Sequence, residues 1–348
     1  MAVTPAVSVI IPTYDCRPLL QGALDALRKQ TLPADDLDVI VIDDGSSDGT
    51  WPYLQETAAG WPQLTVIQQP HSGHPSIARN VGLRRARGRY VFFHDADDWM
   101  PPDALRRLVA DADRLRSDVV VGRARVIGGR REASLIRTAD DADLIKDKVW
   151  TTLSAQKLFR RSFLSRLRLE FSEDMVQGED QVFVATALLA ARRVTTRADD
   201  DYYVRRRTRP GGGNLSDQPQ SLHNKVLTST RMTRLVIERV DTARQPRFLA
   251  RVMIKVLAPG LAGPFMRATE AERDAALAEL RQTVLPHLAP LHLERAEEDR
   301  RLRLLVAAHG TSADLVGLNE WLGRRQQGEP PAAVRRLIRT YDPTRSGS

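Results

Sequence analysis

The chain is organised around the sequence YVFFHDADDW, residues 90–99. A short apolar run rich in β-forming residues ends there in three carboxylates, Asp95, Asp97 and Asp98. Such a run predicts a buried strand that delivers dense negative charge to the carboxyl edge of a sheet, where open α/β sheets bind ligands. Like charges this close repel one another, so the pattern favours a divalent cation, or the hydroxyl groups of a ribose, between them.

The same stretch also has a purely structural interpretation. Pro101, Pro102 and Asp103 suit the first turn of a helix, and the carboxylates would then form a solvated acidic turn that caps it. The stretch alone leaves both interpretations open, so the surrounding sequence has to decide.

Apolar, β-rich runs alternate with helical patterns through the first part of the chain. The predicted strands cover residues 6–12, 37–43, 64–68, 90–93 and 118–122. The predicted helices cover residues 18–30, 48–59 and 76–87, the last with Gly88 at its C-cap. This alternation predicts a βαβαβαβ core, an α/β fold with a mainly parallel sheet covered by helices.

The later part of the chain is helical by its periodicity. Helices are predicted over residues 155–164 and 180–191, and the Arg-, Gly-, Pro- and Ser-rich tract 205–220 predicts a mobile loop near the ligand or an interdomain linker. Beyond it, Thr269 and Glu272 fit a capping box. Six further helices are predicted over residues 221–240, 247–256, 270–285, 296–308, 313–325 and 332–341.

Composition bounds the class of protein. The chain has 348 residues, 42% hydrophobic and 28% charged, which is typical of a globular protein with two domains. The net charge of +8 favours a polyanionic partner: nucleic acid, an anionic membrane face or a phosphate-bearing polymer. A single cysteine, Cys16, and an N-terminus unlike a signal peptide predict a cytoplasmic location. No apolar run approaches the length needed to cross a bilayer, so any membrane association is expected to be peripheral, at the inner face.

Two neighbouring strands end in further polar residues. The first ends in IIPTYD, residues 10–15, and the second in VIDDGSSDGT, residues 41–50. Adjacent parallel strands would place Pro12, Thr13 and Asp44 at the same edge as Asp95 and Asp97. A carboxylate there can accept the imide N–H of uracil. DDGS is also a good turn and N-cap sequence, but the coincidence of several such edges favours binding.

Four motifs occur in order: SVIIPTYD (8–15), VIDDGSSDGT (41–50), SIARNVGLRRARGRYVFFHDADDW (76–99) and GEDQVF (178–183). Together they resemble the family 2 glycosyltransferases with the GT-A fold, a Rossmann-like, mainly parallel sheet with flanking helices. The resemblance implies an inverting glycosyltransferase of the hexosyltransferase type, with a nucleotide-sugar donor, most often a UDP-sugar, and bound Mn²⁺ or Mg²⁺. It also suggests a hydroxyl acceptor on a cell-envelope polymer such as teichoic acid or capsule.

The resemblance assigns roles to individual residues. Asp95-Ala96-Asp97 matches the family's DxD element, in which Asp95 would hold the ribose and help the metal, and Asp97 would be the main metal ligand. Positions that match nucleotide-binding residues are Pro12, Thr13, Asp44 and Arg79. Two positions depart from the usual pattern: Asp15, where many relatives have Asn, and His94, where an apolar residue is commoner and a structural histidine is favoured over a metal or substrate contact.

The GEDQVF segment matches the part of the family that supplies the catalytic base, for which Asp180 is the best candidate. An ordinary carboxylate is ionised at neutral pH and can accept the proton of an attacking hydroxyl. Glu179 and Asp180 would also favour the N-terminus of the following helix electrostatically. Arg206 and Arg207, at the predicted loop, would close over the diphosphate, or else belong to a solvated basic run.

These patterns predict a GT-A domain over residues 1–216, with a nucleotide-sugar half (1–122) and an acceptor half with the active-site loop (123–216). The helical region 217–348 would serve oligomerisation, as a homo-oligomer, or acceptor binding.

Two other classes of protein remain as alternatives. A nucleotidyltransferase predicts a Gly-rich phosphate loop after the first strand, and none follows Pro12. A nucleic-acid- or polyanion-binding protein without catalysis predicts exposed aromatics among basic residues, and aromatics are only 5%.

Overall fold

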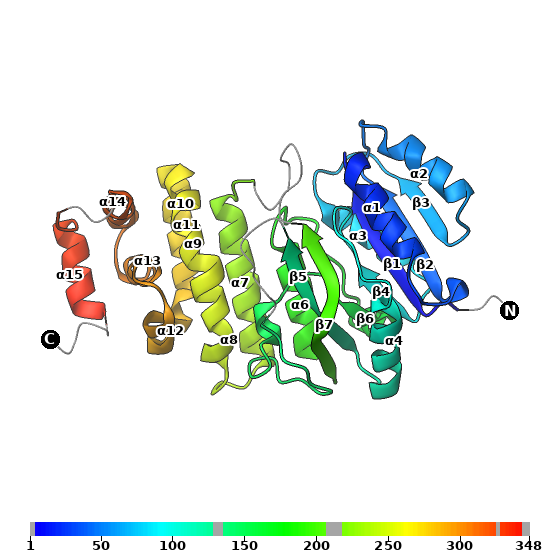
Figure 1. Ribbon diagram of the computed structural model, residues 1–348. Helices are drawn as coiled ribbons and strands as arrows, with labels where there is room; N and C mark the ends of the chain where they lie inside the picture. The colour runs from blue at the N-terminus through cyan, green and yellow to red at the C-terminus, as the bar shows by residue number, and fades with distance from the viewer. Residues whose placement is uncertain (1–3, 128–134, 207–217, 325–327, 343–348) are drawn as a thin grey trace. The chain divides into compact units, whose positions relative to one another are not determined.

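The computed structural model describes residues 4–127, 135–206, 218–324 and 328–342 (Figure 1). The chain divides into two compact units, residues 1–217 and residues 218–348. Each unit is described by itself below.

The first unit is built on a seven-stranded sheet of order β3-β2-β1-β4-β6-β5-β7. All neighbouring strands pair in parallel except β6, which is antiparallel to both β4 and β5. The strands are β1 Val7–Thr13, β2 Leu37–Asp43, β3 Leu64–Gln68, β4 Tyr90–Phe93, β5 Val119–Ile127, β6 Leu158–Arg160 and β7 Val194–Arg206. The order of β1 to β4 confirms the predicted parallel core.

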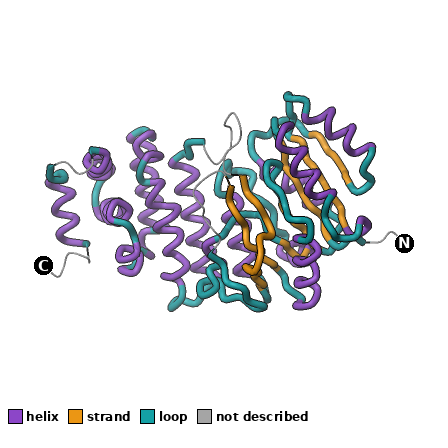
Figure 2. Tube along the Cα trace, viewed as in Figure 1, coloured by secondary structure: helices purple, strands orange, loops and turns teal. Residues whose placement is uncertain are grey.

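Helices flank this sheet (Figure 2). They are α1 Arg17–Arg28, α2 Thr50–Ala59, α3 Pro75–Arg85, α4 Ala104–Leu115, α5 Arg161–Leu167 and α6 Glu179–Ala190. The central strands are continuous apolar runs because helices cover both faces, and every residue of β2 and β4 is buried. The buried strands therefore fix where each chain segment leaves the sheet and exposes its polar residues.

Two predictions for the first unit are wrong. Residues 155–164 do not form one helix, because Leu158–Arg160 form β6 and the helix begins at Arg161. A three-residue buried strand cannot be told from a helical segment by periodicity, and its partners β4 and β5 come from elsewhere in the chain. Arg205 and Arg206 end β7 instead of beginning a loop, and the rest of that predicted loop, up to residue 217, lies outside the described residues.

The second unit is helical. Its elements are α7 Leu222–Arg239, α8 Gln245–Arg251, the π-helical segment η4 Val252–Leu257, α9 Ala258–Gly260, α10 Gly263–Arg267, α11 Glu270–Thr283, α12 Pro290–Arg295, α13 Glu298–His309, α14 Ser312–Gly323 and α15 Ala332–Tyr341. All six predicted helical regions are present, and α9, α10 and α12 were not predicted. The capping box also forms, since the Glu272 N–H donates to Thr269 Oγ1 (3.3 Å) and the Thr269 N–H donates to Glu272 Oε2 (2.8 Å).

One expectation about hydropathy is corrected. Residues 245–267 are long and apolar enough to cross a membrane, by length and composition only, with a mean hydropathy of 1.4 over the best window. Arg251 and Lys255 interrupt this stretch, so the sequence shows no uniform apolar run. In the structure 56% of that window is buried inside the protein, as in the core helix of a helical unit.

Candidate functional site

The site begins where β1, β2 and β4 end. β1 pairs with β2 so that Thr13 lies opposite Asp43, and the Asp44 N–H donates to the Thr13 carbonyl at 2.9 Å. β4 lies on the other side of β1, also in parallel, and its next residues lead to Asp95. The carboxyl edge therefore brings Thr13, Asp44 and Asp95 together, as expected from the pattern of strands.

The Asp44 carboxylate is held by the loop that follows β3. It is buried, and it accepts hydrogen bonds from Gln69 Nε2 (2.6 Å), from the N–H and Oγ of Ser72 (3.0 and 2.8 Å) and from the Gly73 N–H (3.3 Å). Four donors fix the orientation of this carboxylate before any ligand arrives. A uracil imide would have to share its oxygens with these groups, so the predicted base contact stays a prediction.

An aromatic pair lies next to this loop. The ring of His71 stacks on Tyr14, with 4.0 Å between centroids and 24° between planes, and Nδ1 of His71 lies 3.1 Å from Oδ2 of Asp44. Tyr14 is exposed at its outer side. The Oγ1 atom of Thr13 is buried without a hydrogen-bond partner among the described residues. A flat ring with polar edges, such as a nucleobase, would fit a stacking surface of this kind.

Asp15 joins the loops that follow β1 and β2. Its Oδ1 accepts from the Ser47 N–H (2.7 Å), and its own N–H donates to Ser46 Oγ (2.9 Å). Its φ of 42° lies in the left-handed region, which Asp and Asn tolerate better than most residues. The Asp found in place of Asn therefore still supplies the acceptor oxygen that this clamp needs.

Asp95 is the first carboxylate of residues 94–99, the turn after β4, which we call the organising turn. It accepts from Arg79 Nη2 (3.2 Å) and from Gln156 Nε2 (2.5 Å), while its N–H donates to the hydroxyl oxygen of Tyr203 (3.0 Å). The Asp95 side chain keeps 27% of its surface exposed, so one side remains available to a ligand. The Oε1 atom of Gln156 is buried without a partner among the described residues and adds a further oxygen beside Asp95.

Arg79 connects this turn to α6. Its guanidinium is buried, and Nη1 donates to Glu179 Oε1 at 2.8 Å while Nη2 donates to Asp95. Burial alone would lower the pKa of Arg79, but Asp95, Glu179 and Asp180 outweigh it and raise that pKa above its usual value. The arginine is therefore a fixed positive charge between two groups of carboxylates.

Glu179 and Asp180 begin α6, after Gly178, whose φ of 90° only glycine adopts easily. Burial, followed by the charge of Asp180, raises the pKa of Glu179 to about 7, although Arg79 acts in the opposite direction. Burial also raises the pKa of Asp180, whose Oδ1 accepts from the Gln181 N–H at 2.7 Å. A carboxylate with a raised pKa is a stronger base than a free one.

Asp98 was not assigned a role from the sequence, and the structure gives it one. It is buried, accepts from the Arg206 N–H at 2.6 Å and is hydrogen-bonded to Tyr203. Burial, then the charges of Asp95 and Asp97, raises the pKa of Asp98 to about 8. Asp98 thus fastens the organising turn to the end of β7. Nothing in the sequence around Asp98, the residue directly after the DxD element, indicates that its side chain is buried.

The backbone of the organising turn also pairs with the backbone of β7. Trp99 and Val204 exchange both backbone hydrogen bonds, at 3.1 and 2.9 Å, and the Arg206 guanidinium lies 5.5 Å from the centre of the Trp99 ring. Arg205 is exposed over part of its surface. The loss of water around the rest of its side chain would lower its pKa, but nearby carboxylates, Asp95 foremost, outweigh this effect and raise that pKa. Arg206 is thus placed by a strand, and Arg207 lies outside the described residues.

His94 is a buried neutral histidine. Its ring lies 5.1 Å from that of Tyr203, its Nδ1 is 2.7 Å from the Asp95 carbonyl, and burial lowers its pKa to about 4. Nδ1 carries the proton in this arrangement, since a carbonyl oxygen can only accept. These contacts favour the structural interpretation of His94 over a metal contact.

The oxygens of this edge suit a hard cation that also binds phosphate. Asp95 and Asp97 are both partly exposed at the turn. Within the described ranges, no group of three or more His, Cys, Asp or Glu side chains is arranged to hold a metal by itself. Mg²⁺ and Mn²⁺ commonly use one or two carboxylates plus the phosphates of a substrate, so the side chains present fit this mode.

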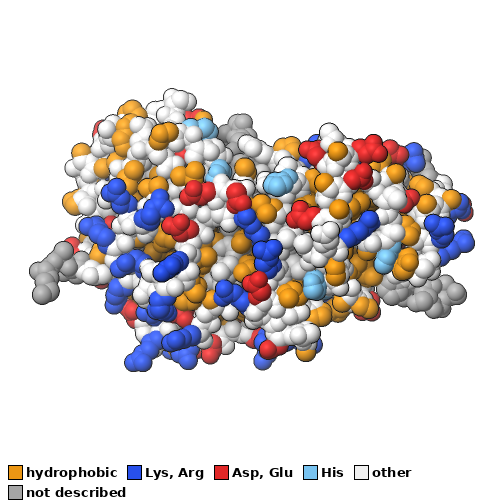
Figure 3. Space-filling model, turned by 180° about the vertical axis from the view of Figure 1, so that it is seen from behind, with side chains coloured by type: hydrophobic (Ala, Val, Ile, Leu, Met, Phe, Trp, Pro, Cys, Tyr) orange, Lys and Arg blue, Asp and Glu red, His pale blue; other side chains and the backbone are white. Residues whose placement is uncertain are grey.

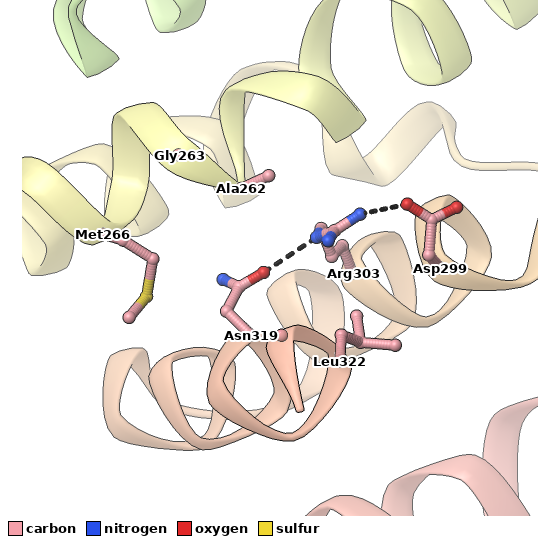
Figure 4. A pocket seen from close by; sticks show the side chains of 8 residues that line it. Ala262, Gly263, Met266, Asp299, Arg303, Asn319 and Leu322 are labelled. Atoms are coloured by element: carbon pink, nitrogen blue, oxygen red, sulfur yellow. Dashed lines mark hydrogen bonds and ion pairs between the residues drawn. The ribbon is translucent and has the colours of Figure 1, made fainter. Parts of the chain in front are cut away.

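A separate hollow of about 410 Å³ lies in the second unit, between α10, α13 and α14 (Figure 4). Arg303 points into it, but Nε donates to Asn319 Oδ1 (2.8 Å) and Nη1 to Asp299 (2.5 Å). Its charge is already balanced, and no group in this hollow is poised for the chemistry of the carboxylate edge.

Comparison with known proteins agrees with this geometry. Residues 8–168 match the family model described as Glycosyl transferase family 2. The poly(ribitol-phosphate) beta-glucosyltransferase of Bacillus spizizenii is 34% identical over 189 residues, 53% of this chain and 30% of that protein. The poly(ribitol-phosphate) beta-N-acetylglucosaminyltransferase TarS of Staphylococcus aureus is 33% identical over 187 residues, 53% of this chain and 32% of that protein. The matched part thus spans about a third of each relative's length.

A solved structure covers more of the chain. The crystal structure of S. aureus TarS 1-349 in complex with UDP-GlcNAc superposes with a TM-score of 0.77 and 25% identity, over 93% of each chain. The GT-A fold with a helical C-terminal region, expected from the sequence, is therefore confirmed.

Proposed function

We propose that this chain, which carries a glycosyl transferase family 2 domain at residues 8–168, transfers a sugar from a UDP-sugar to a hydroxyl group of a phosphate-bearing cell-envelope polymer. The names of the two relatives support poly(ribitol phosphate), a teichoic-acid backbone, as the acceptor, and glucose or N-acetylglucosamine as the sugar. The likeness to a TarS complex with UDP-GlcNAc supports the donor class. We place this activity in the cytoplasm or at the inner face of the membrane.

The observation that carries the proposal is the pair of hydrogen bonds made by Arg79. One guanidinium contacts both Asp95, on the donor side, and Glu179, at the start of α6. A diphosphate next to Asp95 and a base at Asp180 would then lie at one edge of the sheet. A group-transfer enzyme needs this proximity because the nucleophile and the leaving group must meet at a single carbon.

In the transfer, the acceptor oxygen forms a bond to C1 of the sugar from the face opposite the diphosphate. The bond between C1 and the diphosphate oxygen breaks, and the anomeric configuration inverts. The carboxylate of Asp180 takes the proton of the acceptor hydroxyl. Burial strengthens this base by raising its pKa, and the nearby positive charge of Arg79 favours the ionised form in which it can act.

The donor would be held by residues of three loops. Pro12, Thr13 and Asp44 would bind the nucleobase, with Tyr14 as a stacking surface. Asp95 would bind the ribose, and Asp97 with Asp95 would hold Mn²⁺ or Mg²⁺. When bound, such an ion supplies positive charge that stabilises the leaving diphosphate. Arg205 is exposed beside the same carboxylates and would add a guanidinium to the phosphate oxygens, with Arg206 fixed behind it.

The test measures release of UDP from UDP-glucose and UDP-GlcNAc, with and without poly(ribitol phosphate), in Mn²⁺, Mg²⁺ or chelator. Asp97→Ala and Asp180→Asn are compared with Asp103→Asn, a half-exposed carboxylate whose ion pairs with Arg106 and Arg107 are long, at 3.8 and 3.6 Å. Acceptor-dependent release should be lost in the first two variants and kept in the third. Failure of the wild type to bind any UDP-sugar in the presence of metal would refute the proposal.

A further inference from the structure

The positive charge of this chain is concentrated in one segment. Residues 1–217 contain 31 basic and 30 acidic residues, and residues 270–348 contain 12 of each. Residues 218–269 contain nine basic residues and only two acidic ones, Glu238 and Asp241. These 52 residues, which form α7 to α10, therefore carry +7 of the net charge of +8.

Four of these cations recur on one helical face. Arg244, Arg247, Arg251 and Lys255 follow one another at spacings of three, four and four along α8 and η4, and we name them the basic face. This spacing brings side chains to the same side of a helix, about 5 to 6 Å apart along its axis. Arg244, Arg247 and Lys255 are exposed, and Arg251 is half-buried.

The opposite side of the same helix is apolar and already covered. Leu249 keeps 2% of its surface exposed, Val256 keeps 3%, and Val252 and Met253 are fully buried. Phe248, four positions after Arg244, lies beside the basic face, and the Arg244 guanidinium lies 5.6 Å from the centre of its ring. A helix that binds a membrane surface inserts its apolar side between the lipids. Here that side is committed to the core of the second unit, so the side that faces solvent is the charged one.

We infer that the basic face binds the phosphate groups of a polyanionic acceptor, outside the carboxylate edge where the sugar is transferred. A guanidinium group can donate two parallel hydrogen bonds to the oxygens of one phosphate. A row of such groups suits a ligand whose charges repeat along a chain. The identification of this ligand as the acceptor rests on the proposed function. The consequence is that longer polymer chains bind more tightly than short ones, because a second segment is held while a hydroxyl group reacts.

Another group of arginines does not compete with this assignment. Lys and Arg side chains also gather over the part of the first unit near the N-terminus of the chain (Figure 3). Several arginines of the first unit are paired with carboxylates of that unit: Arg84 with Glu170 at 3.3 Å, Arg87 with Asp38 at 2.9 Å and Arg89 with Asp113 at 2.9 Å. The first unit as a whole is almost neutral, so its arginines are balanced within it.

The experiment compares two triple variants of the full chain. Arg244→Gln/Arg247→Gln/Lys255→Gln removes three exposed charges from the basic face. Arg324→Gln/Arg336→Gln/Arg339→Gln removes three exposed charges from the segment with balanced charge. Binding of end-labelled poly(ribitol phosphate) is measured without donor at several salt concentrations. The first variant should bind about tenfold more weakly and with a smaller salt dependence, as expected when phosphate contacts are lost, and the second should change less than twofold.

Two further measurements separate the possible outcomes. Release of UDP from UDP-GlcNAc without acceptor should be equal in all three proteins, because the basic face is outside the donor site. Vesicles of phosphatidylglycerol and phosphatidylcholine should not bind in a way that depends on these residues. The inference is overturned if both variants bind the polymer equally, or if the basic face binds vesicles and not polymer. Polymer binding through this face without any UDP-sugar binding would refute the proposed function and leave the surface assignment standing.

Discussion

Arg79 and Glu179 are 100 positions apart in the chain and form a buried ion pair with 2.8 Å between Nη1 and Oε1. Because the same guanidinium also contacts Asp95, it sets the distance between the organising turn and the start of α6. The alignment of the two carboxylate groups therefore depends on one side chain of α3.

Replacing this arginine tests the dependence. Arg79→Gln should lower kcat/KM about a hundredfold, by misplacing Asp180 and removing a fixed charge. It should also lower the free energy of unfolding by about 3 kcal/mol, since Glu179 loses its buried partner. Arg84→Gln is the control on the same helix, because its ion pair with Glu170 is exposed and should contribute less than about 0.5 kcal/mol. Full activity in Arg79→Gln would show that the pair does not organise the site.

The acid side of the pH–rate profile should report Asp180. As pH falls through its pKa, Asp180 takes up a proton and can no longer accept one. Because burial raises that pKa, kcat/KM should begin to fall at a higher pH than the value of about 4 typical of a free aspartate. Glu179→Gln removes a neighbouring negative charge and should shift this fall to lower pH. The exposed Glu170→Gln serves as the control, and an unchanged profile in Glu179→Gln would contradict the assignment.

His94 should make stability depend on pH. Its folded pKa of about 4 is below the ordinary value of 6.5, so the unfolded chain binds more protons between these two values. Stability is therefore lost as pH falls through this window, by up to about 3 kcal/mol from this group. The raised pKa of Asp98 acts in the opposite direction between about pH 4 and 8, so the measurement is the difference between wild type and His94→Gln. Parallel curves of denaturant midpoint against pH for the two proteins would refute the prediction.

Alanine substitutions at Gly45 and Gly49 distinguish the effect of backbone strain alone from the effect of displacing the loop around Asp44. Both have positive φ, 79° and 86°. A Cβ at Gly45 would lie 3.0 Å from the His71 nitrogen and 3.3 Å from the Gln69 oxygen, whereas a Cβ at Gly49 meets nothing within 4 Å. Gly49→Ala should cost about 1 kcal/mol of stability, and Gly45→Ala about 2 kcal/mol. Only Gly45→Ala should also raise the Kd for a UDP-sugar. Calorimetry of donor binding measures the Kd of each variant, and thermal or denaturant unfolding measures its stability. Equal Kd values in the two variants would show that the loop around Asp44 does not contribute to donor binding.

The neighbouring tyrosines of β7 form a second matched pair. The Tyr203 hydroxyl accepts from the Asp95 N–H and is bonded to Asp98, whereas the Tyr202 hydroxyl contacts Asp199 at 3.3 Å near the surface. Tyr203→Phe leaves a buried N–H and a buried carboxyl without this partner, so it should lower stability by about 2 kcal/mol and weaken metal-dependent donor binding. Tyr202→Phe should change stability by less than about 1 kcal/mol. If Tyr203→Phe binds the donor with wild-type affinity, the contacts of β7 do not contribute to donor binding.

The part of the fold that the sequence predicts is the part with local signals. β1, β2 and β4 are largely apolar, buried runs separated by helices, and each is followed by polar residues whose place at the carboxyl edge follows from parallel pairing. The position of Asp95 and Asp44 needed nothing more. The roles predicted for them are base binding for Asp44, and ribose and metal binding for Asp95.

The missed features depend on partners far away in the chain. β6 has three residues and pairs with β4 and β5, which come from earlier parts of the chain. The sequence DADD does not reveal that Asp98 points inward, because this is set by the Arg206 N–H and Tyr203, more than 100 positions later. The Arg79–Glu179 pair is equally non-local. Such pairings are fixed by the packed tertiary structure and leave no periodic trace in the sequence.

The position of β7 at the end of the sheet has a consequence for synthesis of the protein. During translation, β5 emerges before β7, and its free edge stays unpaired until about 80 further residues have left the ribosome. A nascent chain cut off at this stage would expose a template for intermolecular strand pairing. The boundary of the family match, at residue 168, is thus a poor place to end a recombinant fragment, because such a fragment would expose that edge and aggregate.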